Sequence, residues 1–116
     1  MKITRLYTGE DGESHFEDRE ILLEDAGEIG RLSETEPAIG IIFRETGPEY
    51  DYDWHNAPRR QYIIMLDGQV DVEIGDGTVR RFGPGDILLA EDTTGRGHIS
   101  RSVDGQPRKS IFVVLD

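Results

Sequence analysis

Three polar side chains in the middle and later parts of the chain have types that could bind a metal ion or move a proton: His55, Gln61 and His98. Imidazole nitrogens and an amide oxygen can ligate a divalent transition metal, and we expect iron, manganese, nickel or zinc if one is bound. Without a metal, either imidazole could act as a general base. Both could also do no more than hydrogen-bond to an organic ligand, so the three alternatives stay open.

Neighbouring residues indicate how such a site could be completed. The three candidate metal ligands include no carboxylate, and Asp53, Glu91 or Asp92 could supply one. The carboxylates of the loop before His98 could instead act as a general base or form hydrogen bonds within a turn. Arg59 or Arg60 could pair with a ligand carboxylate or with surface acids. We expect these residues to line the pocket: Trp54, Ala57, Arg59, Ile63, Met65 and Glu91.

His15 is the third and last histidine of the chain. It could cap the predicted binding cavity around His55 and His98 from the N-terminal segment, or it could be an exposed or packing residue with no part in the site.

Short apolar runs bounded by glycine and proline predict the strands that must position these groups. Asp76-Gly77 supplies a hairpin turn between two of them. Residues 55, 57 and 61 share parity, which predicts that they point to one face of one strand, continued by Ile63 and Met65. The predicted strands cover residues 38–44, 62–66, 70–74, 78–82, 87–90, 98–103 and 110–115.

The first 36 residues form an acidic and irregular arm in this interpretation. Ile21-Leu22-Leu23 is its one predicted edge strand, and residues 28–36 are a loop that leads into the barrel at 38–115. Apolar residues of this arm, such as Ile3 and Leu6, could offer a strand to a partner. At 116 residues, the chain is predicted to be one domain.

Composition excludes some classes of partner. The net charge of −11 disfavours nucleic acid and anionic membrane surfaces, which both require a basic face. No run approaches the roughly 20 apolar residues of a membrane span, and the N-terminus lacks a signal-like apolar stretch. The chain has no cysteine, so it has neither disulfides nor thiolate ligands. We therefore expect a cytoplasmic protein that binds neither nucleic acid nor a membrane.

Two segments resemble the paired motifs of the cupin family. In the first, His55 and Gly68 match, while Ala57 stands where the family has a second histidine and Gln61 where it has glutamate. The second segment matches the family at Gly85, Gly95 and His98, with Thr93 in place of its proline and Ser102 in place of its asparagine.

The resemblance implies an all-β fold, a single-domain cupin jelly-roll β-barrel of the double-stranded β-helix type. It also implies a homodimer and a metal held by His55, Gln61 and His98. Three functions are compatible with it: metal-assisted oxygenase, isomerase or lyase chemistry on a small organic molecule; a metal-free binding or sensing module; and a metal-free enzyme in which His98 or His55 is the general base.

Overall fold

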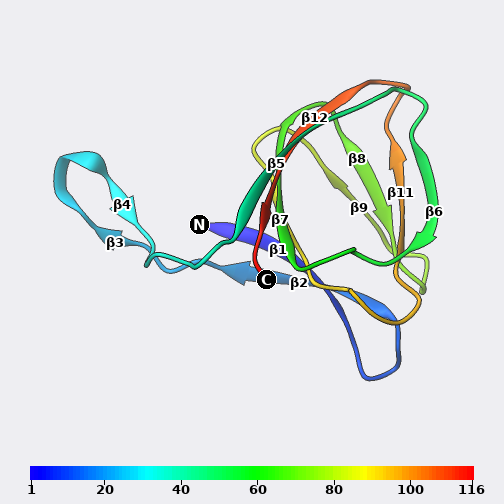
Figure 1. The fold of residues 1–116 in the computed structure, drawn as a ribbon, viewed down its shortest axis with the longest axis horizontal. Coiled ribbons are helices and arrows are strands. Elements are labelled where there is room, and N and C mark those ends of the chain that lie inside the picture. The colour runs from blue at the N-terminus through cyan, green and yellow to red at the C-terminus, as the bar shows by residue number, and fades with distance from the viewer.

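The computed structural model describes all 116 residues as two facing β-sheets with a small projecting hairpin (Figure 1). A 3-10 turn at Gly27–Ile29 is the one helical element, so no helix is long and apolar enough to cross a membrane. The strands are β1 (Lys2–Thr8), β2 (Ser14–Glu20), β3 (Glu24–Asp25), β4 (Arg31–Leu32), β5 (Gly40–Thr46), β6 (Asp51–His55), β7 (Gln61–Asp67), β8 (Val70–Glu73), β9 (Val79–Phe82), β10 (Ile87–Ala90), β11 (His98–Ser102) and β12 (Arg108–Val114).

The larger sheet has six strands in the order β2-β1-β10-β7-β12-β5. All of its pairs are antiparallel except β1 with β10, which are parallel. Side chains alternate between its two faces, as the strand period requires. On β7, Gln61, Ile63 and Met65 face the second sheet, whereas Tyr62 lies in a cluster with Ile3, Leu89 and Leu115 on the opposite side.

The smaller sheet has the order β6-β11-β8-β9 and covers one face of the larger sheet. Strand β8 alternates buried Val70 and Val72 with half-buried Asp71 and Glu73, as its sequence predicts. The main core lies between the sheets and consists of Leu6, Met65, Val70, Val72, Ile74, Phe82 and Leu88. The two sheets do not join into one hydrogen-bonded cylinder, so the jelly roll is a sandwich and not a closed barrel.

The N-terminal segment differs most from expectation. Residues 2–20 form the hairpin β1–β2, a full part of the larger sheet, with Leu6 entirely buried and Ile3 4% exposed. Ile21-Leu22-Leu23 is not a strand. Only residues after it form an arm, because β3, the 3-10 turn and β4 project away from the sandwich (Figure 1). Every residue from 24 to 43 is exposed.

The later strands were predicted with shifts of a few residues. Strand β5 begins and ends two residues after the predicted 38–44, and β12 begins two residues before the predicted 110–115. Strand β6 was not predicted, because Asp51–His55 is mostly polar and exposed. It is stabilised by pairing with β11, where His55 lies opposite His98.

Candidate functional site

A cavity of about 310 Å³ lies between the two sheets and is lined by residues from both. Six of the nine predicted site residues are among its lining: His55, Ala57, Gln61, Ile63, Met65 and His98. The other three, Trp54, Arg59 and Glu91, are not, and each has a partner elsewhere in the chain.

His98 is held in the cavity wall by a buried carboxylate. Its Nδ1 lies 2.6 Å from Oδ2 of Asp92, and the Ser14 hydroxyl donates to the same oxygen at 2.7 Å. Asp92 is completely buried and His98 is 8% exposed. Because Nδ1–H donates to Asp92, the ring is fixed in one tautomer, and Nε2 is left as its free acceptor.

His55 is oriented in a similar way by the backbone. Its Nδ1–H donates to the carbonyl oxygen of Asp53 at 2.7 Å, and its Nε2 lies 3.5 Å from the Ser100 hydroxyl. The ring centres of His55 and His98 are 4.4 Å apart, and the ring centre of Tyr52 is 3.8 Å from that of His55. Burial, with a smaller effect of His98, lowers the pKa of His55 below 6.5, so its neutral form is favoured at neutral pH.

Gln61 lines the cavity but does not share a strand with His55. His55 ends β6 and Gln61 begins β7, so the expectation of one strand carrying residues 55, 57 and 61 is wrong. Parity applies only from Gln61 onward. The Gln61 Oε1 accepts a hydrogen bond from Arg59 at 3.2 Å, which explains why that guanidinium is not free for a ligand.

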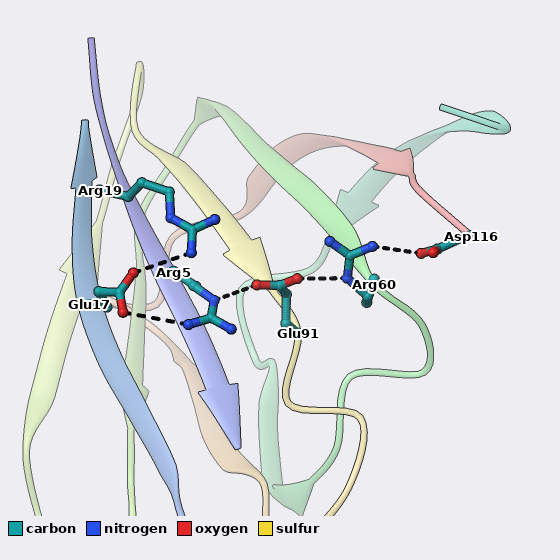
Figure 2. A network of polar contacts seen from close by, with 6 residues as sticks. All are labelled: Arg5, Glu17, Arg19, Arg60, Glu91 and Asp116. Atoms are coloured by element: carbon teal, nitrogen blue, oxygen red, sulfur yellow. Dashed lines mark hydrogen bonds and ion pairs between the residues drawn. The ribbon is translucent and has the colours of Figure 1, made fainter. Parts of the chain in front are cut away.

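Glu91 and Trp54 lie outside the cavity, next to Ala90 and His55 that line it, and each contacts an arginine there. Glu91 accepts hydrogen bonds from Arg5 at 2.5 Å and from Arg60 at 2.6 Å, and Figure 2 shows it between the two guanidiniums. Burial alone would raise the pKa of Glu91, but these two donors keep it below 4.5. The Arg96 guanidinium packs 4.2 Å from the centre of the Trp54 ring.

His15 takes no part in the cavity. Its Nε2 pairs with the Asp11 carboxylate at 2.9 Å, and its ring packs beside Tyr7 on the β1–β2 hairpin. The cap expected as one alternative is therefore absent, and the packing alternative describes this residue.

A close backbone contact brings the two histidine segments together. Gly97 has φ +80°, and a Cβ built on it would lie 2.0 Å from the His55 carbonyl oxygen. The Ala57 amide also donates to the Asp92 carbonyl oxygen at 3.1 Å. Only glycine fits such an approach without strain, so Gly97 positions His98 beside His55.

Among the cavity residues that sequence reasoning missed, two are charged: Arg44 on β5 and Arg108 on β12. The sequence held a signal for Arg44, since it directly follows an apolar run and shares parity with Ile42. The sequence around Arg108 held no such signal, because the side chain points inward as a result of strand pairing with Thr46, which is far away in sequence.

These side chains do not fit a divalent metal ion as they stand. Two imidazole Nε2 atoms are available, but Asp92 is engaged by Ser14 and His98, and Gln61 Oε1 by Arg59. No group of three or more histidine or carboxylate side chains lies close enough to hold an ion. Two arginines in the same cavity add positive charge that would oppose a cation.

Comparison with solved structures places the fold. The cupin domain of Cnp3 from Schizosaccharomyces pombe aligns with a TM-score of 0.52 and 12% identity, over 99% of this chain and 84% of that one. Protein NMB1881 from Neisseria meningitidis aligns with a TM-score of 0.52 and 17% identity, over 72% of this chain and 84% of that one. No family model matches the sequence, and no curated protein does. At these identities the likeness shows the fold alone, and the predicted cupin-like jelly roll is confirmed.

Proposed function

We propose that this chain binds a small organic molecule in the cavity between its sheets, without a metal ion. The single observation that carries the proposal is the pair of cavity imidazoles, each held through Nδ1 so that Nε2 remains an acceptor. Most of the remaining lining is apolar, including Ile63, Met65 and Phe112. An apolar cavity with a few convergent polar groups is typical of a ligand site.

Proton transfer by His98 is a second candidate function, favoured by its contact with Asp92. A buried carboxylate that fixes the tautomer of a histidine also stabilises the imidazolium formed when Nε2 takes a proton. The Asp92–His98 pair can therefore accept a proton from a ligand and return it. An enzyme of this kind needs no metal, in contrast to the oxygenase, isomerase or lyase chemistry expected from the cupin resemblance.

The test combines metal analysis with ligand binding. Protein purified without a tag or chelator is analysed for metals by mass spectrometry, then titrated with benzamide, phenol and benzoate while amide signals are followed by NMR. We expect less than 0.1 metal per chain and ligand-induced shifts around His55, Gln61 and His98. One metal per chain that is lost in His98→Ala would instead support the metal-assisted alternative and contradict the proposal.

A cavity-filling variant locates the binding. Ala57 is buried against the cavity, whereas Ala38 is exposed near the arm. Ala57→Leu should weaken binding of the best probe at least tenfold, and Ala38→Leu should leave it unchanged. Equal affinities in the two variants would show that the probes bind elsewhere.

We also propose that the chain forms a homodimer through the outer face of the larger sheet. Phe43, Ile111, Ile64 and Ile87 lie in register across β5, β12, β7 and β10 on this face. Phe43 is 76% exposed and Ile41, beside it on the edge strand, is 57% exposed. A continuous apolar row ending at an open sheet edge is a surface that a second copy can cover with the same surface.

Light scattering after size exclusion tests the dimer. The wild-type chain should elute with twice the mass of one chain, and Phe43→Ser should elute as a monomer. Val79→Ser on β9 removes an apolar, 47% exposed side chain from the smaller sheet and should remain dimeric. A monomeric wild-type chain would contradict the proposal.

A further inference from the structure

Two cavity arginines are the only arginines of this chain that have no carboxylate, amide or carbonyl oxygen as a partner. Neither Arg44 nor Arg108 makes an ion pair or donates to a carboxylate, an amide oxygen or a backbone carbonyl, and the neighbour of both guanidiniums is Tyr50. Every other arginine donates to a carboxylate, an amide oxygen or a backbone carbonyl. The chain has 24 acidic residues against 13 basic ones, so a lack of carboxylates does not explain the exception.

Arg108 is also deeply buried. It is 4% exposed, and its Nη1 is a buried donor with no acceptor. Burial, together with the nearby charge of Arg44, lowers the pKa of Arg108 from its ordinary value. A buried guanidinium without a counter-charge is unfavourable, and such groups in folded proteins are normally paired. The counter-charge is therefore expected from outside the chain.

Aromatic rings and strand pairing hold both guanidiniums at one end of the cavity. The Arg44 and Arg108 Cζ atoms lie 5.1 Å and 4.8 Å from the centre of the Tyr50 ring. Ser110 lies opposite Arg44 across the β12–β5 pair, and its hydroxyl is buried without a partner. This end of the cavity thus presents two cations and a free hydroxyl.

A hydrogen-bonded path connects this end with the histidines. The Tyr50 hydroxyl donates to the Ser100 hydroxyl oxygen at 3.4 Å, and Ser100 lies 3.5 Å from His55 Nε2. The arginine end and the histidine end therefore belong to one site, with Ile63, Met65 and Phe112 along the wall of the larger sheet.

We propose that the ligand of this cavity is a small organic carboxylate whose carboxylate group is bound by Arg44 and Arg108. The proposal rests on the proposed function, because it names the class of molecule that the cavity binds. Planar guanidiniums match the geometry of a carboxylate, and Ser110 can donate a further hydrogen bond. The apolar wall contacts the body of the molecule, and its far end meets His55 and His98.

The cavity limits the size of this acid. Liquid water occupies about 30 Å³ per molecule, so a cavity of 310 Å³ admits a compound of on the order of ten non-hydrogen atoms. Monocarboxylates with an aromatic ring or a short branched chain satisfy both this volume and the apolar wall.

Matched acids and amides test the proposal. Benzoate with benzamide, phenylacetate with phenylacetamide, and hexanoate with hexanamide are titrated into the full chain, and affinities are measured by NMR. Each acid should bind at least tenfold more tightly than its amide. Phenyl phosphate is added to the panel; if it binds and no carboxylate does, the assignment to carboxylates is overturned.

Arginine variants identify the subsite. Arg44→Met and Arg108→Met should each weaken benzoate binding at least tenfold while leaving benzamide within twofold. Arg81→Met removes one positive charge from the surface pair with Asp71 and should leave both affinities unchanged. Because Arg44 and Arg108 are tested separately, misfolding of one variant leaves the other informative.

The outcomes separate this proposal from the proposed function. Equal affinities for acids and amides, both lost in Ala57→Leu, would overturn the carboxylate proposal and retain the ligand cavity. No binding by any member of the panel would contradict both. Benzoate affinity that is unchanged in Arg44→Met and Arg108→Met would place the anion elsewhere.

Discussion

Two pairs of arginines, one at each face of the six-stranded sheet, have opposite electrostatic surroundings. Arg5 and Arg60 bind the two oxygens of Glu91 at the outer face, and the chain of contacts continues to Glu17 and Asp116 (Figure 2). Arg44 and Arg108 face the cavity and bind no acid of the chain. In the folded chain, the outer pair of guanidiniums has carboxylate partners, whereas the inner pair has none.

The difference separates a structural role from a binding role for the same side chain. In the outer network, an acid of the chain compensates the charge, so the network contributes to stability with no ligand present. In the cavity, the charge is uncompensated, so it reduces stability until an anion binds. Substitutions in the two regions should therefore change the free energy of unfolding in opposite directions, and the predictions below test this.

The largest loss of stability is expected from Glu91→Gln. The substitution removes the charge that two guanidiniums share while keeping the shape, and hydrogen bonds to charged partners contribute about 2 kcal/mol each. We expect the free energy of unfolding at pH 7 to fall by about 2–4 kcal/mol, measured by urea denaturation. Glu17→Gln is the matched control, since its side chain is 42% exposed, and should cost about 0.2–1 kcal/mol.

The pH dependence of Glu91→Gln checks the cause. The pKa of Glu91 is lowered in the folded chain, so its stabilising effect is present above pH 4.5 and is lost as the pH falls through the folded pKa. The difference between the wild-type chain and Glu91→Gln should thus shrink below pH 4. A difference that stays constant down to pH 3 would show that charge is not responsible.

Arg108→Met should act in the opposite direction. Methionine fills much of the arginine stem volume and removes a buried charge without a partner, so we expect a gain of about 1 kcal/mol in the chain without ligand. Excess benzoate should abolish or reverse the gain, because it stabilises only the chain that retains the arginine. A loss of stability without ligand would mean that Arg108 is compensated within the chain. Arg81→Met is again the surface control.

A smaller change in the free energy of unfolding is expected from the titration of His55. Burial and the adjacent His98 lower its pKa in the folded state, while the unfolded chain titrates near 6.5. The unfolded state then binds more protons, so the neutral ring's contribution to stability is complete above pH 6.5 and decreases as the pH falls toward the folded pKa. Denaturation series from pH 8 to pH 5 on the wild-type chain and His55→Asn measure it. Parallel curves for the two proteins would contradict the prediction.

The sequence predicted the centre of the fold because its signals there are local. Val70–Glu73 alternates apolar and acidic residues, Asp76-Gly77 supplies a turn, and Ile87–Ala90 is an uninterrupted apolar run. From these patterns and the cupin motifs, the jelly roll could be predicted. The face of β7 that carries Gln61, Ile63 and Met65 followed from parity.

The parts of the fold that could not be predicted depend on contacts between segments distant in sequence. Strand β2 has polar or charged residues at most positions, and it is a strand because β1 pairs with it and also with β10, more than 80 residues away. Strand β6 likewise depends on β11. The same holds for the site: Asp92 reaches His98 only after the loop folds against Ala57, and Arg108 points inward because Thr46 lies opposite it.

The smallest effect on the free energy of unfolding is expected from Tyr62, whose hydroxyl also has its partner within the chain. The Tyr62 hydroxyl donates to the Glu36 carboxylate and thereby fastens the segment after β4 to the sheet. Burial, and then this carboxylate, raise the pKa of Tyr62 to about 12. Its neutral form therefore contributes stability below pH 10, which is lost as the pH rises through 12.

Absorbance titration of the phenols measures this directly, with Tyr62→Phe to identify the signal. Glu36→Gln should lower the pKa of Tyr62, yet leave it above 10.0 because burial remains, whereas Glu34→Gln should not change it. An unchanged value in Glu36→Gln would mean that the two segments are not in contact in solution. A lowered value would show that Glu36 is the partner of Tyr62 in solution, so that this polar group of the outer face, in contrast to Arg44 and Arg108, has its partner within the chain.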